Sequence, residues 1–553
     1  CDLCELTNVY GIWVSQNTLV PAFNKQPIAL DFVDMFRPLV DQSDIVPPVR
    51  QQSTDHTTYT SGTNDTYAHN SSSPRGIKNT PLCSSSGHRA YRLTSVRPHC
   101  VSRLLVLSMQ QEQLAHVGGV VDPWETVGSE CTQSVKHVAV GSALYFNASL
   151  ITLSGEFNMT VRHGRESLVI PGPTTVPDEV LRAMHRPAVD IFDEDLVETT
   201  DFCIAHLKQI FHTAGDVYIY AANGHGAWEG ALANVLSPGD AVLILNSGRF
   251  AEAWGKMADM MNLDVLTLPQ DWRHAVDPAQ VEERLRADSA NQIKAVLVVQ
   301  VDTASGVVND IPAIRSAMSA AGHDALLMVD TIASLATMPF EMDAWGVDVS
   351  VSGSQKGLMT PPGLSFVAAG ERAVAAHETA GLRTRYWDWT SRQGELHPEK
   401  YCGTPPEHML FGLRAALDLL SEEGLDKVIT RHRLLAEAVR SAVAVWCEEG
   451  VLEFNIIEPC DRANSVTTVL VDKAHDPLAL RQYCKEHCGL VLGVGIGDLR
   501  GKALRIAHMG HVNAPMMLGA LGVIEMGLIA LSIPHGSGGV QKAIEYLGKN
   551  VQP

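Results

Sequence analysis

A lysine, an aspartate and several glycine-rich turns each follow a short apolar run of strand length in the region after residue 175. Lys356 follows the run 347–353, and Asp330 closes the run 325–330. Three more such runs end in turns that contain small or polar residues: Asn223-Gly224-His225-Gly226, Ser247-Gly248-Arg249-Phe250 and Thr303-Ala304-Ser305-Gly306. In open α/β sheets ligands bind beyond the carboxyl ends of the strands. These five segments are therefore the first candidates for a binding site.

The residue types suit a flat, phosphorylated aromatic aldehyde. A phosphate needs backbone N–H donors at a helix start, with glycine to allow close approach, and the turn 223–226 ahead of an expected helix at 225–236 provides them. A pyridinium nitrogen needs a carboxylate, here Asp330, and an aldehyde needs an amine, here Lys356. Phe250 offers an aromatic face to the ring. The sequence thus predicts a pyridoxal-phosphate site.

Each of these residues also has a simpler interpretation. An aspartate at a strand end commonly caps a helix or stabilises a turn, and a single lysine after a strand is usually a solvated surface charge. The glycines alone would indicate ordinary turns. An isolated buried carboxylate at Asp330 would be costly without a cationic partner. One ligand accounts for all five segments, and this joint pattern favours the cofactor site.

Regular elements are expected to position these residues. The runs 217–222, 241–246, 264–269, 295–300, 325–330, 347–353 and 364–369 are expected strands, and 225–236, 250–262, 278–287 and 310–322 are expected helices. Continuous apolar strands joined by helices predict a mostly parallel, doubly wound α/β sheet. We expect a large domain at 159–430 with a substrate-mouth segment at 165–177. A smaller α+β domain is expected at 431–553, with helices at 430–449, 477–488 and 515–534 and strands at 465–471 and 504–509.

Several motifs resemble those of one enzyme family. The text SVSGSQKGLMTPPG around Lys356 is similar to the cofactor-lysine motif of class V aminotransferases, and IPGPTTVP at 170–177 to their opening motif. NGHGAWEGALANVLSPGD, VDTIAS and GKALRIAHMG match further motifs in order. The resemblance covers about 165–540 and is greatest to alanine/serine–glyoxylate aminotransferases. It implies fold type I, a homodimer with shared active sites, and transfer of an amino group from serine, alanine or aspartate to glyoxylate.

The resemblance also implies a role for individual residues. Lys356 would be the Schiff-base lysine and proton shuttle, Asp330 the partner of the pyridine nitrogen, and Phe250 the ring-stacking aromatic. The remaining cofactor contacts would come from Gly224, His225 and Gln355 at the phosphate, from Thr303 at the ring hydroxyl, and from Tyr401 and Thr404 at the phosphate of the neighbouring subunit's cofactor. Arg505 would grip the substrate carboxylate, a bidentate task suited to guanidinium. Pro171, Gly172 and Pro173 would line the substrate mouth.

Composition excludes other classes of protein. The net charge of −20 disfavours a nucleic-acid partner. Residues 1–158 match nothing in the family, and the polar, turn-rich stretch 52–87 lacks hydrophobic periodicity, so we expect a disordered or non-native extension. The apolar segment 515–534 could be taken for a membrane span, but Glu525 in its middle favours a buried core helix. We see no signal peptide or membrane partner and expect a cytoplasmic protein with reduced cysteines.

The sequence permits five other interpretations. The glycines at 493, 495 and 497 lack the spacing of a dinucleotide loop, and the Cys484–Cys488 segment lacks the second ligand pair of a metal site, so no metal is expected. A pyridoxamine–pyruvate aminotransferase would differ at few pocket residues and stays open. A cysteine desulfurase usually has histidine before the lysine, where this chain has Gln355. A non-catalytic protein of the same fold would have little need for Lys356, Asp330 and Arg505 together.

Overall fold

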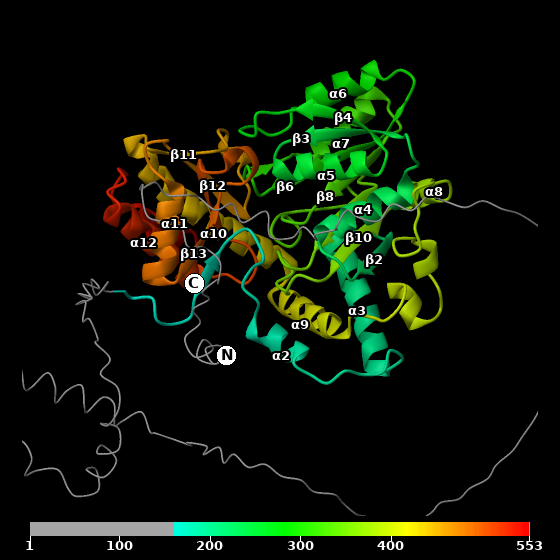
Figure 1. Cartoon of the computed structure of the whole chain (residues 1–553), viewed down its shortest axis with the longest axis horizontal. Helices are drawn as coiled ribbons and strands as arrows, with labels where there is room; N and C mark the ends of the chain where they lie inside the picture. The colour runs from blue at the N-terminus through cyan, green and yellow to red at the C-terminus, as the bar shows by residue number, and fades with distance from the viewer. Residues whose placement is uncertain (1–159, 552–553) are drawn as a thin grey trace, which may run out of the picture. The chain divides into compact units, whose positions relative to one another are not determined.

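The computed structural model describes residues 160–551, so the predictions made for 1–158 lie outside the described part of the chain. Its main element is a seven-stranded sheet in the order β2-β10-β9-β8-β5-β3-β4 (Figure 1). All neighbours pair in parallel except β10, which is antiparallel to both β2 and β9. The strands are β2 Asp216–Tyr220, β3 Ala241–Asn246, β4 Asp264–Pro269, β5 Ile293–Val299, β8 Leu326–Asp330, β9 Val349–Gly353 and β10 Ser365–Ala369. The predicted doubly wound, mostly parallel sheet of fold type I is confirmed.

Helices cover both faces of this sheet because its strands are apolar on both sides. One core includes side chains of α3 Glu194–Phe211, α6 Pro278–Ala287, α7 Ile311–Ala321 and α9 Glu407–Glu423. The core on the opposite face includes side chains of α4 Gly224–Val235, α5 Arg249–Met260 and α8 Glu371–His377. The short helix α2 Asp178–Met184 packs on α9. Sequence patterns did not predict α3 or α9.

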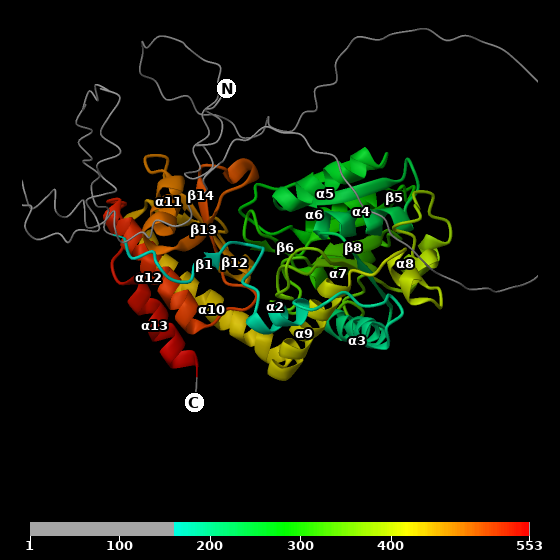
Figure 2. The same cartoon turned by 60° about the horizontal axis from the view of Figure 1, so that its bottom comes forward.

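A second, five-stranded sheet has the order β1-β13-β14-β12-β11. Its strands are β1 Ser167–Val169, β11 Leu452–Phe454, β12 Val466–Val471, β13 Leu490–Val494 and β14 Ala503–Ala507. Four helices share one apolar core with it (Figure 2): α10 Leu425–Trp446, α11 Pro477–Cys488, α12 Ala514–Ala530 and α13 Gly539–Asn550. The expected domain boundary at 430 falls within α10. The mouth segment 165–177 contributes β1 to this second sheet. In the first domain, β5 is followed by a small two-stranded antiparallel ribbon of β6 Val301–Asp302 and β7 Val307–Val308.

The apolar segment near the carboxyl terminus forms α12, as expected. Glu525 accepts hydrogen bonds from Trp446 Nε1 (2.9 Å) and the Val540 amide (3.0 Å), which explains why a carboxylate is tolerated in this helix. Met517, Leu521 and Leu528 face the core, whereas Ile529 is 66% exposed. Within residues 160–551 no helix has the length and apolar character needed to cross a bilayer.

Candidate active site

A cavity of about 230 Å³ lies at the carboxyl ends of the parallel strands. It brings together seven of the predicted site residues, which come from five segments far apart in sequence: Gly224, His225, Phe250, Thr303, Asp330, Gln355 and Lys356. The remaining lining residues are Asn223, Trp228, Val299, Val301, Ile332 and Ala333. The parallel strand order therefore gathers these side chains at one edge of the sheet, as the sequence predicted.

Asp330 lies at the end of β8 and is 3% exposed. Its Oδ2 accepts a hydrogen bond from Trp228 Nε1 (2.8 Å), and its Oδ1 accepts one from the Ile332 amide (2.6 Å). Burial raises the pKa of Asp330 to about 7, although both hydrogen bonds and Lys356 favour the charged form. The site thus holds a carboxylate that gains strongly from a cationic partner.

Lys356 lies in the turn after β9 and is 8% exposed. Its Nζ donates to the Pro171 carbonyl, while its own carbonyl accepts the hydroxyl of Thr174 (3.1 Å). At Gly357 a Cβ would lie 2.1 Å from the Leu335 carbonyl, so glycine is required for the turn to pack here. Burial and the charge of Arg505 together lower the pKa of Lys356 to about 8, although Asp330 and Asp302 oppose the shift. Part of this amine is therefore neutral near physiological pH.

The amino end of α4 forms another wall of the cavity. Asn223 caps the helix, and its side chain accepts the amides of His225 (3.1 Å) and Gly226 (3.4 Å). A Cβ at Gly224 would lie 2.4 Å from Ile332 Cδ1, so glycine lets the helix start approach the turn after β8. The exposed His225 has a lowered pKa because of partial burial and the nearby Arg249.

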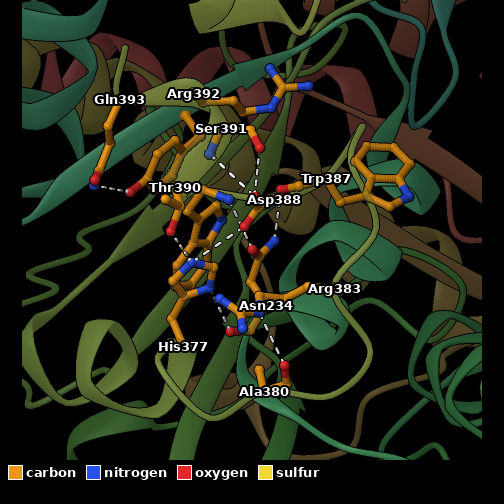
Figure 3. A network of polar contacts seen from close by, with 12 residues as sticks. Asn234, His377, Ala380, Arg383, Trp387, Asp388, Thr390, Ser391, Arg392 and Gln393 are labelled. Carbon is orange, nitrogen blue, oxygen red and sulfur yellow. Dashed lines mark hydrogen bonds and ion pairs between the residues drawn. The ribbon is translucent and has the colours of Figure 1, made fainter. Parts of the chain in front are cut away.

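A polar network fixes α4 from its other end (Figure 3). Asn234 donates to the carbonyls of Gly230 (2.7 Å) and Trp387 (2.8 Å) and accepts the Trp389 amide (3.0 Å). His377 contacts the Asn234 carbonyl (3.1 Å) and the hydroxyl of Thr390 (2.9 Å). Because Asn234 is fully buried, the segment around 387–390 holds α4, and with it the helix start at the cavity.

An aromatic wall stands beside Asp330. The ring of Phe250, in the first turn of α5, meets Trp228 edge-on with 6.5 Å between centroids, and Trp228 stacks on Trp254 at 5.8 Å. Phe250 was predicted from the sequence, whereas Trp228, which is fully buried and bonded to the site carboxylate, was not. Trp228 lies four positions after Gly224, one helical turn into α4, and this spacing was the available signal.

Arg505, on β14, lies next to the site without lining the cavity. Its Nη1 donates to the Thr303 carbonyl (2.9 Å) and its Nε to the Val494 carbonyl (2.6 Å). It is 8% exposed, and burial lowers its pKa to about 10. The fully buried Asp302 interacts electrostatically with Arg505, and sequence reasoning missed this residue as well.

The other predicted residues lie in two places. The segment Pro171-Gly172-Pro173 follows β1, and a Cβ at Gly172 would lie 2.6 Å from Lys356 Nζ, so this segment closes over the lysine. Tyr401 and Thr404 do not reach the cavity of their own chain. The hydroxyl of Tyr401 is bonded to Thr200 Oγ1 at 2.8 Å in the protein interior, and Thr404 is exposed.

Comparison with known proteins identifies the family. Residues 192–497 match the aminotransferase class-V profile. The chain is 39% identical to a serine–glyoxylate aminotransferase of Methylorubrum extorquens, over 71% of this chain and 98% of the relative. It is 35% identical to an L-aspartate–glyoxylate aminotransferase of Paracoccus denitrificans, over 68% and 95% respectively. The solved ureidoglycine–glyoxylate aminotransferase of Bacillus subtilis superposes with a TM-score of 0.64 at 25% identity, covering 70% of this chain and 98% of that structure.

The chain belongs to the class-V aminotransferase family, as its motifs suggested. It is a pyridoxal-phosphate-dependent aminotransferase of fold type I. The residues of the cavity fit this cofactor. They provide a buried carboxylate, an amine with a lowered pKa and an aromatic side chain, and the buried amide oxygen of Gln355 has no hydrogen-bond partner among residues 160–551.

Proposed function

We propose that the protein transfers an amino group from a small amino acid, such as serine, alanine or aspartate, to glyoxylate, giving glycine and a 2-oxo acid. The observation that carries this proposal is the pairing of a buried, partly neutral Lys356 with the buried carboxylate of Asp330 in one cavity. The names of the relatives, serine–glyoxylate and L-aspartate–glyoxylate aminotransferase, support glyoxylate as the acceptor.

The residues divide the work by their chemistry. When bound, pyridoxal phosphate supplies an aldehyde that takes up amines and a ring that withdraws electrons from the substrate α-carbon. Lys356 is the residue whose amine would hold this aldehyde and would carry the proton at the substrate α-carbon. Asp330 would pair with the ring nitrogen, which would offset the cost of burying its charge. Arg505 binds the substrate carboxylate in a bidentate manner.

The remaining contacts orient the cofactor and enclose the substrate. Phe250 would provide the aromatic face for the ring, and Thr303 would bond its hydroxyl group. Gly224, His225 and Gln355 would hold the phosphate at the amino end of α4, where the helix dipole favours an anion. Pro171, Gly172 and Pro173 line the substrate mouth and exclude water from Lys356, whose Nζ already contacts the Pro171 carbonyl.

The test is a screen of amino donors against glyoxylate and pyruvate, with glycine and alanine as the detected products. Serine, alanine, aspartate and pyridoxamine are the donors, and the Lys356→Ala variant is the control for uncatalysed transfer. Glycine formation that requires Lys356 supports the proposal. Transfer from pyridoxamine to pyruvate without glycine formation would instead support the function of the pyridoxamine–pyruvate transaminase of Mesorhizobium japonicum, which is 30% identical.

A desulfurase function has less support. No cysteine lines the cavity among the six in the described residues, and Cys203 and Cys484 are buried with pKa values raised to about 12 by burial. A nucleophilic thiolate needs the opposite environment. Two desulfurase structures that superpose on this chain are 15% and 16% identical, which shows the fold alone.

We further propose a homodimer in which Tyr401 and Thr404 bind the phosphate of the partner's cofactor. Thr404 is exposed and available for such a contact, whereas Tyr401 must first release Thr200. Mixing a Lys356→Ala chain with a Tyr401→Phe/Thr404→Ala chain would restore activity, because one hybrid site then has every residue. Verified heterodimers that stay inactive would count against shared sites.

A further inference from the structure

Asp302 is a fully buried carboxylate beside the site and has no part in the proposed contacts with cofactor or substrate. It lies at the end of β6, directly before Thr303. Three backbone amides donate to it: Phe250 (2.8 Å) and Ala251 (3.1 Å) to Oδ2, and Ala304 (2.9 Å) to Oδ1. The first two amides belong to the first turn of α5, so Asp302 caps this helix. Gly248, the residue at the N-cap position of α5, has no side chain to do so.

Gly248 makes this arrangement possible. A Cβ at Gly248 would lie 2.1 Å from Asp302 Cγ, so any other residue would displace the carboxylate or the helix start. The φ of Gly248 is 173°, an extended value that any residue can adopt, so the reason for glycine here is space. The close approach ties β6 to the turn that presents Phe250.

Asp302 also faces the charged groups of the site. Burial raises the pKa of Asp302, whereas the three amides and the charge of Arg505 favour its ionised form. When ionised, Asp302 raises the pKa of Lys356, of Asp330 and of Arg505. It is the carboxylate that stabilises the charged guanidinium of Arg505, which is otherwise bonded to the neutral carbonyls of Thr303 and Val494. Removing this charge therefore alters several groups of the site together.

We propose that Asp302 is a positioning residue that caps α5 to fix Phe250 and serves as the internal counter-ion of Arg505 and Lys356. The role of Phe250 and Arg505 rests on the proposed function, whereas the capping and the charge are properties of this chain alone. Asp302 does not line the cavity and acts through its neighbours. The counter-ion offsets the repulsion between Arg505 and the protonated form of Lys356.

The test compares Asp302→Asn with Asp310→Asn. Asp310 caps α7 through the Ala313 amide (3.0 Å) and is exposed, so its variant loses a capping carboxylate away from the cavity. Asp302→Asn removes the charge and leaves one acceptor oxygen, so the amide nitrogen would face either the Ala304 amide or the amides of Phe250 and Ala251, and the cap is weakened in both cases. The first readout uses the cofactor-free protein, in which acetylation of Lys356 is followed by mass spectrometry across a pH series.

The expected result has a defined sign. Because the charge of Asp302 raises the pKa of Lys356, its removal should move the midpoint of labelling to lower pH and speed labelling at pH 7 about threefold. The affinity for pyridoxal phosphate, measured by absorbance, should fall by about tenfold because the weakened cap holds Phe250 less firmly. Asp310→Asn should match the wild type in both readouts.

An unchanged labelling midpoint and unchanged cofactor affinity in Asp302→Asn would overturn the proposal. If this variant does not fold, Asp302→Glu replaces it, since glutamate keeps the charge but is too long for the space beside Gly248. If the pH midpoint of Lys356 labelling in Asp302→Glu equals that of the wild type while the affinity for pyridoxal phosphate is weakened, the proposal is supported. A shifted labelling midpoint, or an affinity equal to that of the wild type, refutes it. Neither readout requires turnover, so failure to transfer an amino group to glyoxylate would leave this test intact.

Discussion

Replacing Trp228 by Phe is expected to make cofactor binding more sensitive to acid. The indole Nε1 donates to Asp330 Oδ2 at 2.8 Å, and both side chains are buried. This hydrogen bond favours the charged carboxylate, whose pKa burial has already raised to about 7. Removing the donor raises the pKa of Asp330 further, so that less of the carboxylate is ionised at neutral pH.

The size of the effect follows from the geometry. A hydrogen bond to a charged group contributes roughly 1.5–3 kcal/mol, and one pKa unit corresponds to about 1.4 kcal/mol. The pKa of Asp330 should therefore rise by about one unit or more, and the ionised fraction at pH 7 should fall from about one half to about one tenth. Affinity for pyridoxal phosphate at pH 7 should drop about fivefold, and the loss should become smaller as pH rises.

The assay titrates cofactor-free protein with pyridoxal phosphate from about pH 6 to pH 9 and follows visible absorbance. Trp254→Phe is the matched control, because Trp254 is buried and stacked on Trp228, while its Nε1 has no partner among the described residues. Both variants lose the same volume from the same core. A pH dependence for Trp228→Phe equal to that of Trp254→Phe would refute the reasoning.

Three further predictions concern the substrate, the mouth segment and acid stability. Arg505→Lys should lower kcat/KM for amino acids about a hundredfold through loss of bidentate binding, with cofactor affinity nearly unchanged, whereas an unchanged half-reaction rate would make the residue structural. Gly172→Ala should lose more activity than the control Gly424→Ala. Both glycines have a positive φ (93° for Gly172 and 85° for Gly424), so both variants carry backbone strain. Only at Gly172 would the new methyl group crowd Lys356, since at Gly424 it meets no atom within 4 Å. Burial lowers the pKa of His432 to about 4. The contribution of this residue to the free energy of unfolding should therefore fall by about 3 kcal/mol as pH falls from about 6.5 to 4. In urea titrations, the free energy of unfolding of His432→Gln should depend less on pH over this range.

Local sequence signals predicted the elements that have clear boundaries. β3 spans 241–246 and α11 spans 477–488 in both prediction and structure. The first is a continuous apolar run, and the second has Asp476 as its cap, Pro477 in its first turn and Gly489 in the left-handed conformation at its end. By contrast, β1 has three residues and exists because it pairs with β13, more than three hundred positions away. Local patterns do not encode such a pairing.

The same distinction applies to the site. Strand ends located Asp330 and Lys356 because parallel order places such residues at one edge. Asp302 was missed because its partners are amides of a helix start some fifty positions earlier, and a buried capping carboxylate resembles an ordinary turn residue in sequence. For Tyr401 the sequence predicted a role that a single chain does not test. Its motif indicated a contact at a subunit interface, while within one chain its hydroxyl is bonded to Thr200.

The central claim is that Lys356 is the residue that binds pyridoxal phosphate covalently. The most direct measurement is borohydride reduction of the cofactor-loaded protein followed by peptide mapping. The predicted result is a cofactor label on the peptide that contains Lys356, together with loss of the yellow colour and of the label in Lys356→Ala. A label on any other lysine, or a coloured and reducible Lys356→Ala protein, would contradict the account.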